Sequence, residues 1–127
     1  MRIFKTKAFA RFAARANLGD VLLCEAVQRA VTGLVDARLG GGVIKQRIAR
    51  KGKGRSGGFR SVILFREKDK AFFVYGFAKG RRSNISQTEL KAFRMLANGM
   101  LNMDDAALLA ALRNGTIMEV ICDDKTI

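Results

Sequence analysis

Apolar residues in the first third of the chain recur at helical spacing. A short strand is expected at residues 2–5, followed by a helix at residues 7–16 with Thr6 as its possible N-cap. A second helix is predicted at residues 20–33, because its apolar side chains again fall three and four positions apart. Three consecutive glycines, 40–42, then interrupt the pattern.

The middle of the chain is rich in β-branched and aromatic residues, which favour strands. Three strands are predicted, at residues 43–49, 59–66 and 71–77. Residues 67–70 suit a tight hairpin between the last two strands, and the glycine-rich residues 51–58 suit a longer loop between the first two. An antiparallel meander is the simplest arrangement of these strands.

Helices are predicted again after the strands. Ser86 and Glu89 form a capping box, which should open a helix that runs to about Ala97 and ends at the following Asn-Gly pair. A last helix is expected at residues 103–113 and a short strand at residues 116–122. The order β-α-α-β-β-β-α-α-β predicts an α+β domain, with a small twisted antiparallel sheet and helices packed on one face.

Positive charge is concentrated in the centre of the chain. At 127 residues the chain has the size of a single domain, and its formal net charge is +13, from 24 Lys and Arg against 11 Asp and Glu. Residues 45–82 contain 13 of these cations and two of the acids, a net of +11. A solvated charged face is the ordinary explanation, but residues 45–55 contain no acid to offset their mutual repulsion. The distribution favours a polyanionic partner, such as nucleic acid, an anionic membrane surface or an acidic protein.

The rest of the sequence favours a cytoplasmic location. No apolar run approaches the ~20 residues of a membrane span, so no membrane association is expected. Cys24 and Cys122 do not make a disulfide framework, and without a signal peptide they fit a reducing cytosol. The basic, acid-free residues 1–19 offer an alternative as a transit peptide or an interfacial helix, although their phenylalanines serve equally well as core anchors.

Gly52-x-Gly54-x-x-Gly57 has the letter pattern of a dinucleotide-binding loop but lacks its context. That loop needs a helix after the glycines and an acid about 20 positions later, whereas residues 59–66 are typical of a strand. A Walker A loop would need Ser or Thr directly after a Gly-Lys pair, and none follows here. The glycines are better explained by a slim loop whose cations and backbone amides surround a phosphate backbone. A plain hairpin loop that uses glycine for positive φ is the alternative.

The residue inventory limits the chemistry of this region to Lys, Arg and backbone amides. The chain has no histidine, its two cysteines are far apart, and its acids form no evident metal-binding set. Neither a metal nor a small-molecule cofactor is expected. RNA supplies its own nucleophile, the 2′-hydroxyl beside each phosphate, so clustered cations can stabilise the transition state and move protons. Such a site would cleave free RNA poorly and would need something else to align the substrate.

Residues 40–96 resemble the HigB-like branch of the RelE/ParE superfamily of bacterial type II toxin–antitoxin toxins. The shared features, in order, are a basic strand, a Gly-Lys-Gly-Lys/Arg-x-Gly-Gly loop, a strand led by Arg, an aromatic strand that ends in Lys, and a helix. The resemblance implies a RelE-like fold and an endoribonuclease that cuts mRNA in the ribosomal A site and so inhibits translation. The ribosome would then supply the missing alignment. A cognate antitoxin is also implied, usually a small DNA-binding protein that represses the operon.

The resemblance implies roles for individual cations. Arg60 and Lys79 are expected to stabilise the transition-state charge, and Lys53 to transfer protons. The cations expected to bind RNA phosphates are Lys45, Arg47, Lys51, Arg55, Arg81 and Arg82. The last two extend the set beyond the family pattern, which has an Asn-Glu pair after the lysine.

Alternatives stay open for two segments and for the function. Tyr75 lies among phenylalanines and is expected in the core, the alternative being a platform for base stacking. Residues 100–127 form an extension beyond the usual last helix of the family, with five acids and two cations. We expect them to complete the core, the alternative being that they fold over the basic face. The other candidate functions are a non-catalytic nucleic-acid-binding module and a toxin of the same fold that blocks another target, such as gyrase.

Overall fold

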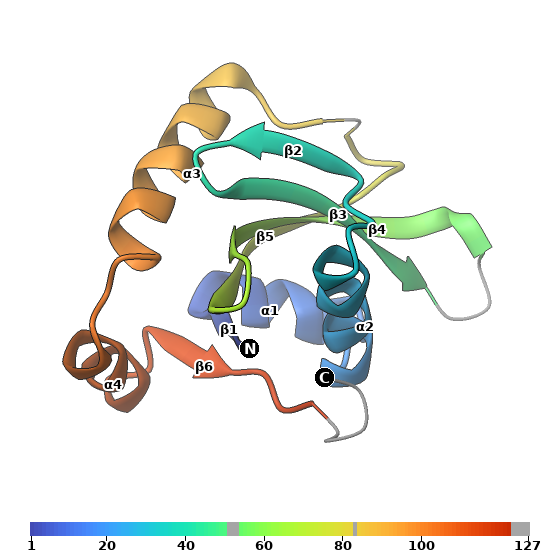
Figure 1. The fold of residues 1–127 in the computed structure, drawn as a ribbon. Helices are drawn as coiled ribbons and strands as arrows, with labels where there is room; N and C mark the ends of the chain where they lie inside the picture. Colours follow the sequence, from blue (N-terminus) through green and yellow to red (C-terminus); the bar gives the residue numbers. More distant parts are fainter. Residues whose placement is uncertain (51–53, 83, 123–127) are drawn as a thin grey trace.

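The computed structural model describes residues 1–50, 54–82 and 84–122. In this part of the chain one six-stranded sheet, in the order β2-β3-β4-β5-β1-β6, is accompanied by four helices (Figure 1). The elements are β1 (Arg2–Thr6), α1 (Lys7–Arg15), α2 (Asp20–Val31), β2 (Ala37–Gly40), β3 (Val43–Arg50), β4 (Gly54–Arg66), β5 (Lys70–Ala78), α3 (Gln87–Met100), α4 (Asp105–Arg113) and β6 (Ile117–Glu119). The α+β class is confirmed, and neighbouring strands are antiparallel except β1 and β5, which run parallel.

The helices cover both faces of the sheet. α1 and α2 pack on the face that carries Ile63 and Phe73, and α3 and α4 on the face that carries Leu64 and Phe72. All four side chains are fully buried, and successive residues of a strand point to opposite faces. A sheet that is apolar on both faces must be covered on both, so the predicted packing of helices on one face is wrong.

Side-chain caps set the helix starts as the sequence predicts. The Thr6 hydroxyl accepts a hydrogen bond from the Phe9 backbone N–H at 3.2 Å, and the Ser86–Glu89 capping box is present. The predicted end of the third helix at the Asn-Gly pair is wrong, because α3 continues to Met100. Ala97 and Leu101, one turn apart on either side of that pair, are both buried, and this packing favours continuation of the helix.

Two hairpins connect neighbouring strands in the centre of the chain, β2 to β3 and β4 to β5. The pattern of apolar residues in the sequence does not predict β2. This strand reverses into β3 through Gly40, Gly41 and Gly42, which all have positive φ. The predicted tight hairpin at residues 67–70 is confirmed, and Lys68 lies in its left-handed position with φ of 62°. β4 begins at Gly54, so part of the predicted glycine loop is strand instead.

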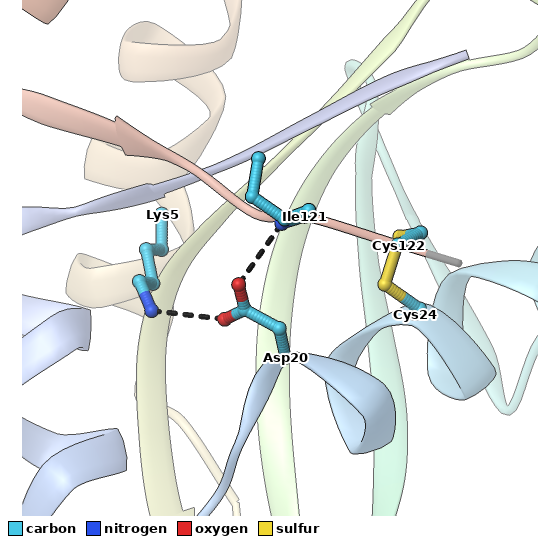
Figure 2. Close-up of a disulfide and its surroundings, with 5 residues drawn as sticks. All are labelled: Lys5, Asp20, Cys24, Ile121 and Cys122. Atoms are coloured by element: carbon cyan, nitrogen blue, oxygen red, sulfur yellow. Dashed lines mark hydrogen bonds and ion pairs between the residues drawn. A yellow bond between two sulfur atoms is a disulfide. The ribbon is translucent and has the colours of Figure 1, made fainter. Parts of the chain in front are cut away.

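The two cysteines form a disulfide, which corrects the expectation that they stay reduced. Cys24 of α2 is bonded to Cys122, which follows β6, across a sequence separation of 98 residues (Figure 2). Beside this bond, the Asp20 carboxylate accepts hydrogen bonds from Lys5 Nζ at 3.1 Å and from the Ile121 backbone N–H at 2.9 Å (Figure 2). The end of the described chain is thereby fixed to α2 and β1.

Residues 100–122 complete the core. Leu101, Leu108, Ile117 and Val120 are buried, and β6 pairs with β1 at the edge of the sheet opposite β2. β5 and β1 separate β6 from β4, whereas the residues before α4 contact β4 directly, because the Arg66 guanidinium donates to the Leu101 carbonyl and to the Asn102 side-chain oxygen. None of the helices in the described ranges is long and apolar enough to cross a membrane.

Candidate nucleic-acid interface

Two arginines face each other across β3 and β4. Arg47 is the register partner of Arg60, which is in turn opposite Phe77 of β5. In the neighbouring row Lys45 is opposite Val62, and Val62 is opposite Tyr75. Directly opposed residues project from the same face, here the α3 face, on which Val62 and Tyr75 pack. β3 and β4 thus present three cations side by side, an arrangement that is unfavourable unless an anion offsets it.

The three cations differ in how far the protein satisfies them. The ammonium group of Lys45 donates to the side-chain oxygen of Asn84 at 3.2 Å. The guanidinium of Arg47 is 4.0 Å from Asp36, which also lies 4.0 Å from Arg29. The Arg60 side chain makes no hydrogen bond or ion pair to any residue that the structure describes, and its Nη1 is shielded from solvent. The guanidinium of Arg60 therefore retains its hydrogen-bonding capacity for a ligand.

The turn after β5 presents two further cations to solvent. Lys79 and Arg81 are exposed and have no ion pair within the described residues. The Arg81 backbone N–H donates to the Ala78 carbonyl at 3.0 Å, which folds the turn back onto the end of the strand. The two side chains are therefore displayed at the end of β5, whose Phe77 and Tyr75 adjoin the cation rows.

Arg82 is held by the protein on several sides. Its guanidinium forms a bidentate ion pair with Glu89, with N–O distances of 2.6 and 3.1 Å. It also donates to the Tyr75 hydroxyl at 2.9 Å and to the Asn84 carbonyl at 2.9 Å. The guanidinium carbon lies 5.8 Å from the Tyr75 ring centre and 5.6 Å from that of Phe77, within cation–π range.

This pairing shifts the titration of both partners. The Arg82 guanidinium, followed by the Ser86 backbone N–H, lowers the pKa of Glu89 from 4.5 to about 2. Conversely, the Glu89 carboxylate raises the pKa of Arg82. The ion pair is consequently fully charged at neutral pH.

A hollow of ≈ 600 Å³ lies beside the second half of β5. β1 pairs with β5 only as far as Phe73, so in the described part of the chain the later residues of β5 have no strand on that side. The lining combines aromatic rings with three arginines and includes Phe12, Arg15, Tyr75, Phe77, Arg81 and Arg82. Single-stranded nucleic acid is bound by such combinations of rings and cations.

The structure gathers some of the predicted site residues and leaves others undescribed. Lys45, Arg47 and Arg60 share one face of the sheet, while Lys79, Arg81 and Arg82 lie at the adjoining end of β5. Lys51 and Lys53 are outside the described residues, and only the backbone of Arg55 is described, within β4. The roles of all these residues stay predictions.

Sequence reasoning missed Arg15 and the second partner of Glu89. Arg15 lies in the last turn of α1 and borders the hollow beside β5. Nothing in the sequence distinguishes it from the other basic residues of that helix. Glu89 is recognisable as a capping residue, and that role concealed its ion pair with Arg82. Tyr75 packs against Phe77 and Phe93, as expected of a core residue, but its hydroxyl also accepts a hydrogen bond from Arg82. A local motif identifies one contact of a side chain and says nothing of contacts that depend on the fold.

The donor set can bind anions and stabilise negative charge. Among the described residues no three His, Cys, Asp or Glu side chains gather in a way that could hold a metal ion. Arginine forks match the geometry of phosphate oxygens, and lysine contributes a point charge. The face formed by β3, β4 and the end of β5 is thus suited to a phosphate backbone.

Comparison with known proteins supports a family assignment. A search of curated proteins finds no match. The family model described as the RelE toxin of the RelE / RelB toxin–antitoxin system matches residues 1–120, which includes every helix and strand named above. The chain therefore belongs to the RelE toxin family of toxin–antitoxin systems.

Proposed function

We propose that this protein is a ribosome-dependent mRNA endoribonuclease of the HigB-like branch, the toxin of a type II system that inhibits translation. The observation that carries the proposal is the Arg47–Arg60 pair, two like charges in direct register on the α3 face of the sheet. The Arg60 guanidinium has no hydrogen-bond or ion-pair partner among the described residues, so a substrate phosphate would supply the missing counter-charge.

The reaction requires no group beyond the RNA and the cations. The 2′-oxygen attacks the adjacent phosphorus, the bond from phosphorus to the 5′-oxygen breaks, and the products end in a 2′,3′-cyclic phosphate and a 5′-hydroxyl. One proton leaves the 2′-hydroxyl and one reaches the departing 5′-oxygen. Arg60 and Lys79 would stabilise the added negative charge, and Lys53 would transfer a proton. On this mechanism the enzyme needs neither a metal nor a small-molecule cofactor.

Substrate alignment is assigned to the ribosome. The described cations lie on a sheet face and at a strand end. Cations in these positions could bind a phosphate, but they would not align the 2′-hydroxyl with the bond that breaks. mRNA held in the A site would arrive already positioned. The RelE assignment implies a cognate antitoxin as the second partner, and we propose that this antitoxin is a small DNA-binding protein. Action on ribosomes places the protein in the cytoplasm, where the Cys24–Cys122 bond would be exposed to reduction.

Primer extension on mRNA in a purified bacterial translation system tests the proposal. The wild-type protein should produce codon-phased cuts only on translating ribosomes, and Arg60→Ala and Lys79→Ala should abolish them. Arg113→Ala, which removes an exposed cation on α4, is the charge-matched control and should cut normally. Intact mRNA together with salt-sensitive RNA binding would instead establish the non-catalytic binding module. Intact mRNA with growth arrest in cells would indicate a different target.

A further inference from the structure

Glu89 connects the start of α3 to the basic turn after β5. One carboxylate oxygen accepts hydrogen bonds from the Ser86 backbone N–H at 2.7 Å and from Arg82 Nη2 at 2.6 Å. The other oxygen accepts from Arg82 Nη1 at 3.1 Å. A capping box alone needs only the bond to Ser86, so both bonds to Arg82 are additional to helix capping.

Arg82 extends this connection to the sheet. It donates to the Tyr75 hydroxyl in β5 and to the Asn84 carbonyl, and the Asn84 side chain accepts a hydrogen bond from Lys45 in β3. A continuous set of polar contacts thus runs from Glu89 through Arg82 and Asn84 to Lys45. Lys79 and Arg81, which make no such contacts within the described residues, lie on the same turn.

The contacts of Arg82 also limit its own availability. Four of the five N–H donors of its guanidinium are used, by Glu89 twice, by Tyr75 and by Asn84. Its charge is offset by a carboxylate that remains ionised down to a pKa of about 2. Arg82 is thus suited to hold the turn in place, whereas Lys79, Arg81 and Arg60 remain free to meet a phosphate.

We infer that Glu89 is a positioning residue for the basic turn: acting through Arg82, it holds Lys79 and Arg81 in reach of the RNA phosphate. This inference rests on the proposed function. Net charge alone would predict the opposite effect, because an acid beside a basic face should weaken the binding of a polyanion. If Glu89 were only a counter-charge, its removal would strengthen RNA binding and leave turnover intact.

Glu89→Gln separates these two possibilities. Glutamine can still accept the bond from the Ser86 N–H, so α3 keeps its cap while the ion pair with Arg82 is lost. Glu67→Gln is the matched control, because Glu67 is exposed on the β4–β5 hairpin and its replacement raises the net charge equally. Thermal unfolding of both variants establishes that they are folded.

The first measurement is single-turnover cleavage of ribosome-bound mRNA. Glu89→Gln should lower the rate roughly 10-fold to 100-fold, as expected when charged groups are displaced from the reacting centre, while Glu67→Gln should not change it. Arg82→Ala should have a similar effect, and the double variant should be no worse than either single one, because Glu89 acts through Arg82. Equal cleavage rates for wild type and Glu89→Gln would overturn the inference. So would a double variant in which the rate losses of the two single variants add.

The second measurement does not depend on cleavage. The salt dependence of binding to a short single-stranded RNA reports how many phosphates the protein neutralises, with a slope of about 0.7 per contact. Glu89→Gln should bind with a shallower slope than the wild type despite its extra positive charge, because Lys79 and Arg81 lose their placement. An unchanged or steeper slope would show that Glu89 is merely a counter-charge. A wild-type protein that cleaves no mRNA would overturn the proposed function, and the slopes would still decide the role of Glu89.

Discussion

At the scale of single residues, the site places like charges where stability alone would favour opposite ones. Arg47 and Arg60 are in direct register, and like charges in such pairs are destabilising. Asp36 lies near Arg47 but makes no ion pair with Arg60. Residues kept at some expense of stability are typical of functional sites.

Replacement of Arg60 should therefore separate activity from stability. We expect Arg60→Ala to lower the cleavage rate by about 10²–10³, the usual effect of removing one donor to a developing oxyanion. The free energy of unfolding should change by less than about 1 kcal/mol, because relief of the like-charge pair offsets the lost packing of the aliphatic stem. Urea denaturation and single-turnover kinetics measure the two quantities. Strong destabilisation would mean that Arg60 has a structural role.

Glu89 gives a prediction about pH. Its pKa is lowered from 4.5 to about 2 in the folded protein, so the stabilisation from its charged form is fully present above pH 4.5 and is lost as the pH falls through 2. The difference in unfolding midpoint between wild type and Glu89→Gln should be constant from pH 7 to about 5 and should shrink towards pH 2. Urea titrations across this range measure it. A difference that persists undiminished at pH 2 would show that the ion pair with Arg82 is not its source.

At the scale of elements, the sequence predicts where helices start better than where they end, and better than which strands pair. Thr6 and Ser86 cap their helices locally, so short motifs are sufficient to find them. The continuation of α3 past Gly99 depends on the burial of Leu101 in the core, which no local pattern contains. β2 is short and contains no β-branched residue, so its pairing with β3 also had no signal in the sequence.

The contact between α1 and β5 depends on a glycine. A Cβ atom at Gly76 would overlap the ring of Phe12, which is confined by Phe9 and Phe59 at ring-centre distances of 5.7 Å each. Gly76→Ala should destabilise the protein by about 1–3 kcal/mol, as overpacking does. In a Phe12→Ala background the same substitution should cost clearly less, since the overlapping ring is gone. Urea denaturation of the four proteins measures this, and equal costs in both backgrounds would exclude the proposed overlap.

The Cys24–Cys122 bond should stabilise the fold by restricting the unfolded chain. Disulfides that close long loops typically contribute about 2–4 kcal/mol, and this one spans 98 residues. Reductant should lower the melting temperature by roughly 10 °C. Cys122→Ser should melt at the lower temperature with or without reductant. A melting temperature that does not respond to reductant in the wild type would show that the bond does not form or does not matter.

At the scale of the whole molecule, alternating patterns predict the class of fold but not how the sheet is covered. The strand and helix order follows from the two periodicities, and the placement of Lys45, Arg47 and Arg60 on one face agrees with strand alternation. The fully buried pair Phe72 and Phe73 required helices on both faces, which the predicted arrangement did not provide. The disulfide and the Arg82–Glu89 pair join residues through the fold, so the sequence alone does not reveal them.

The overall charge of +13 and the RelE family assignment lead to one central claim, that the basic face cleaves mRNA through the RNA's own 2′-hydroxyl. The most direct test uses ribosomes programmed with an mRNA that carries a single 2′-deoxynucleotide immediately before the scissile phosphate. The account predicts that the all-ribose mRNA is cut there, leaving a 2′,3′-cyclic phosphate, and that the deoxy-substituted mRNA stays intact at that position. Equal cleavage of both mRNAs would contradict it, because the attacking group would then have to come from water or from the protein.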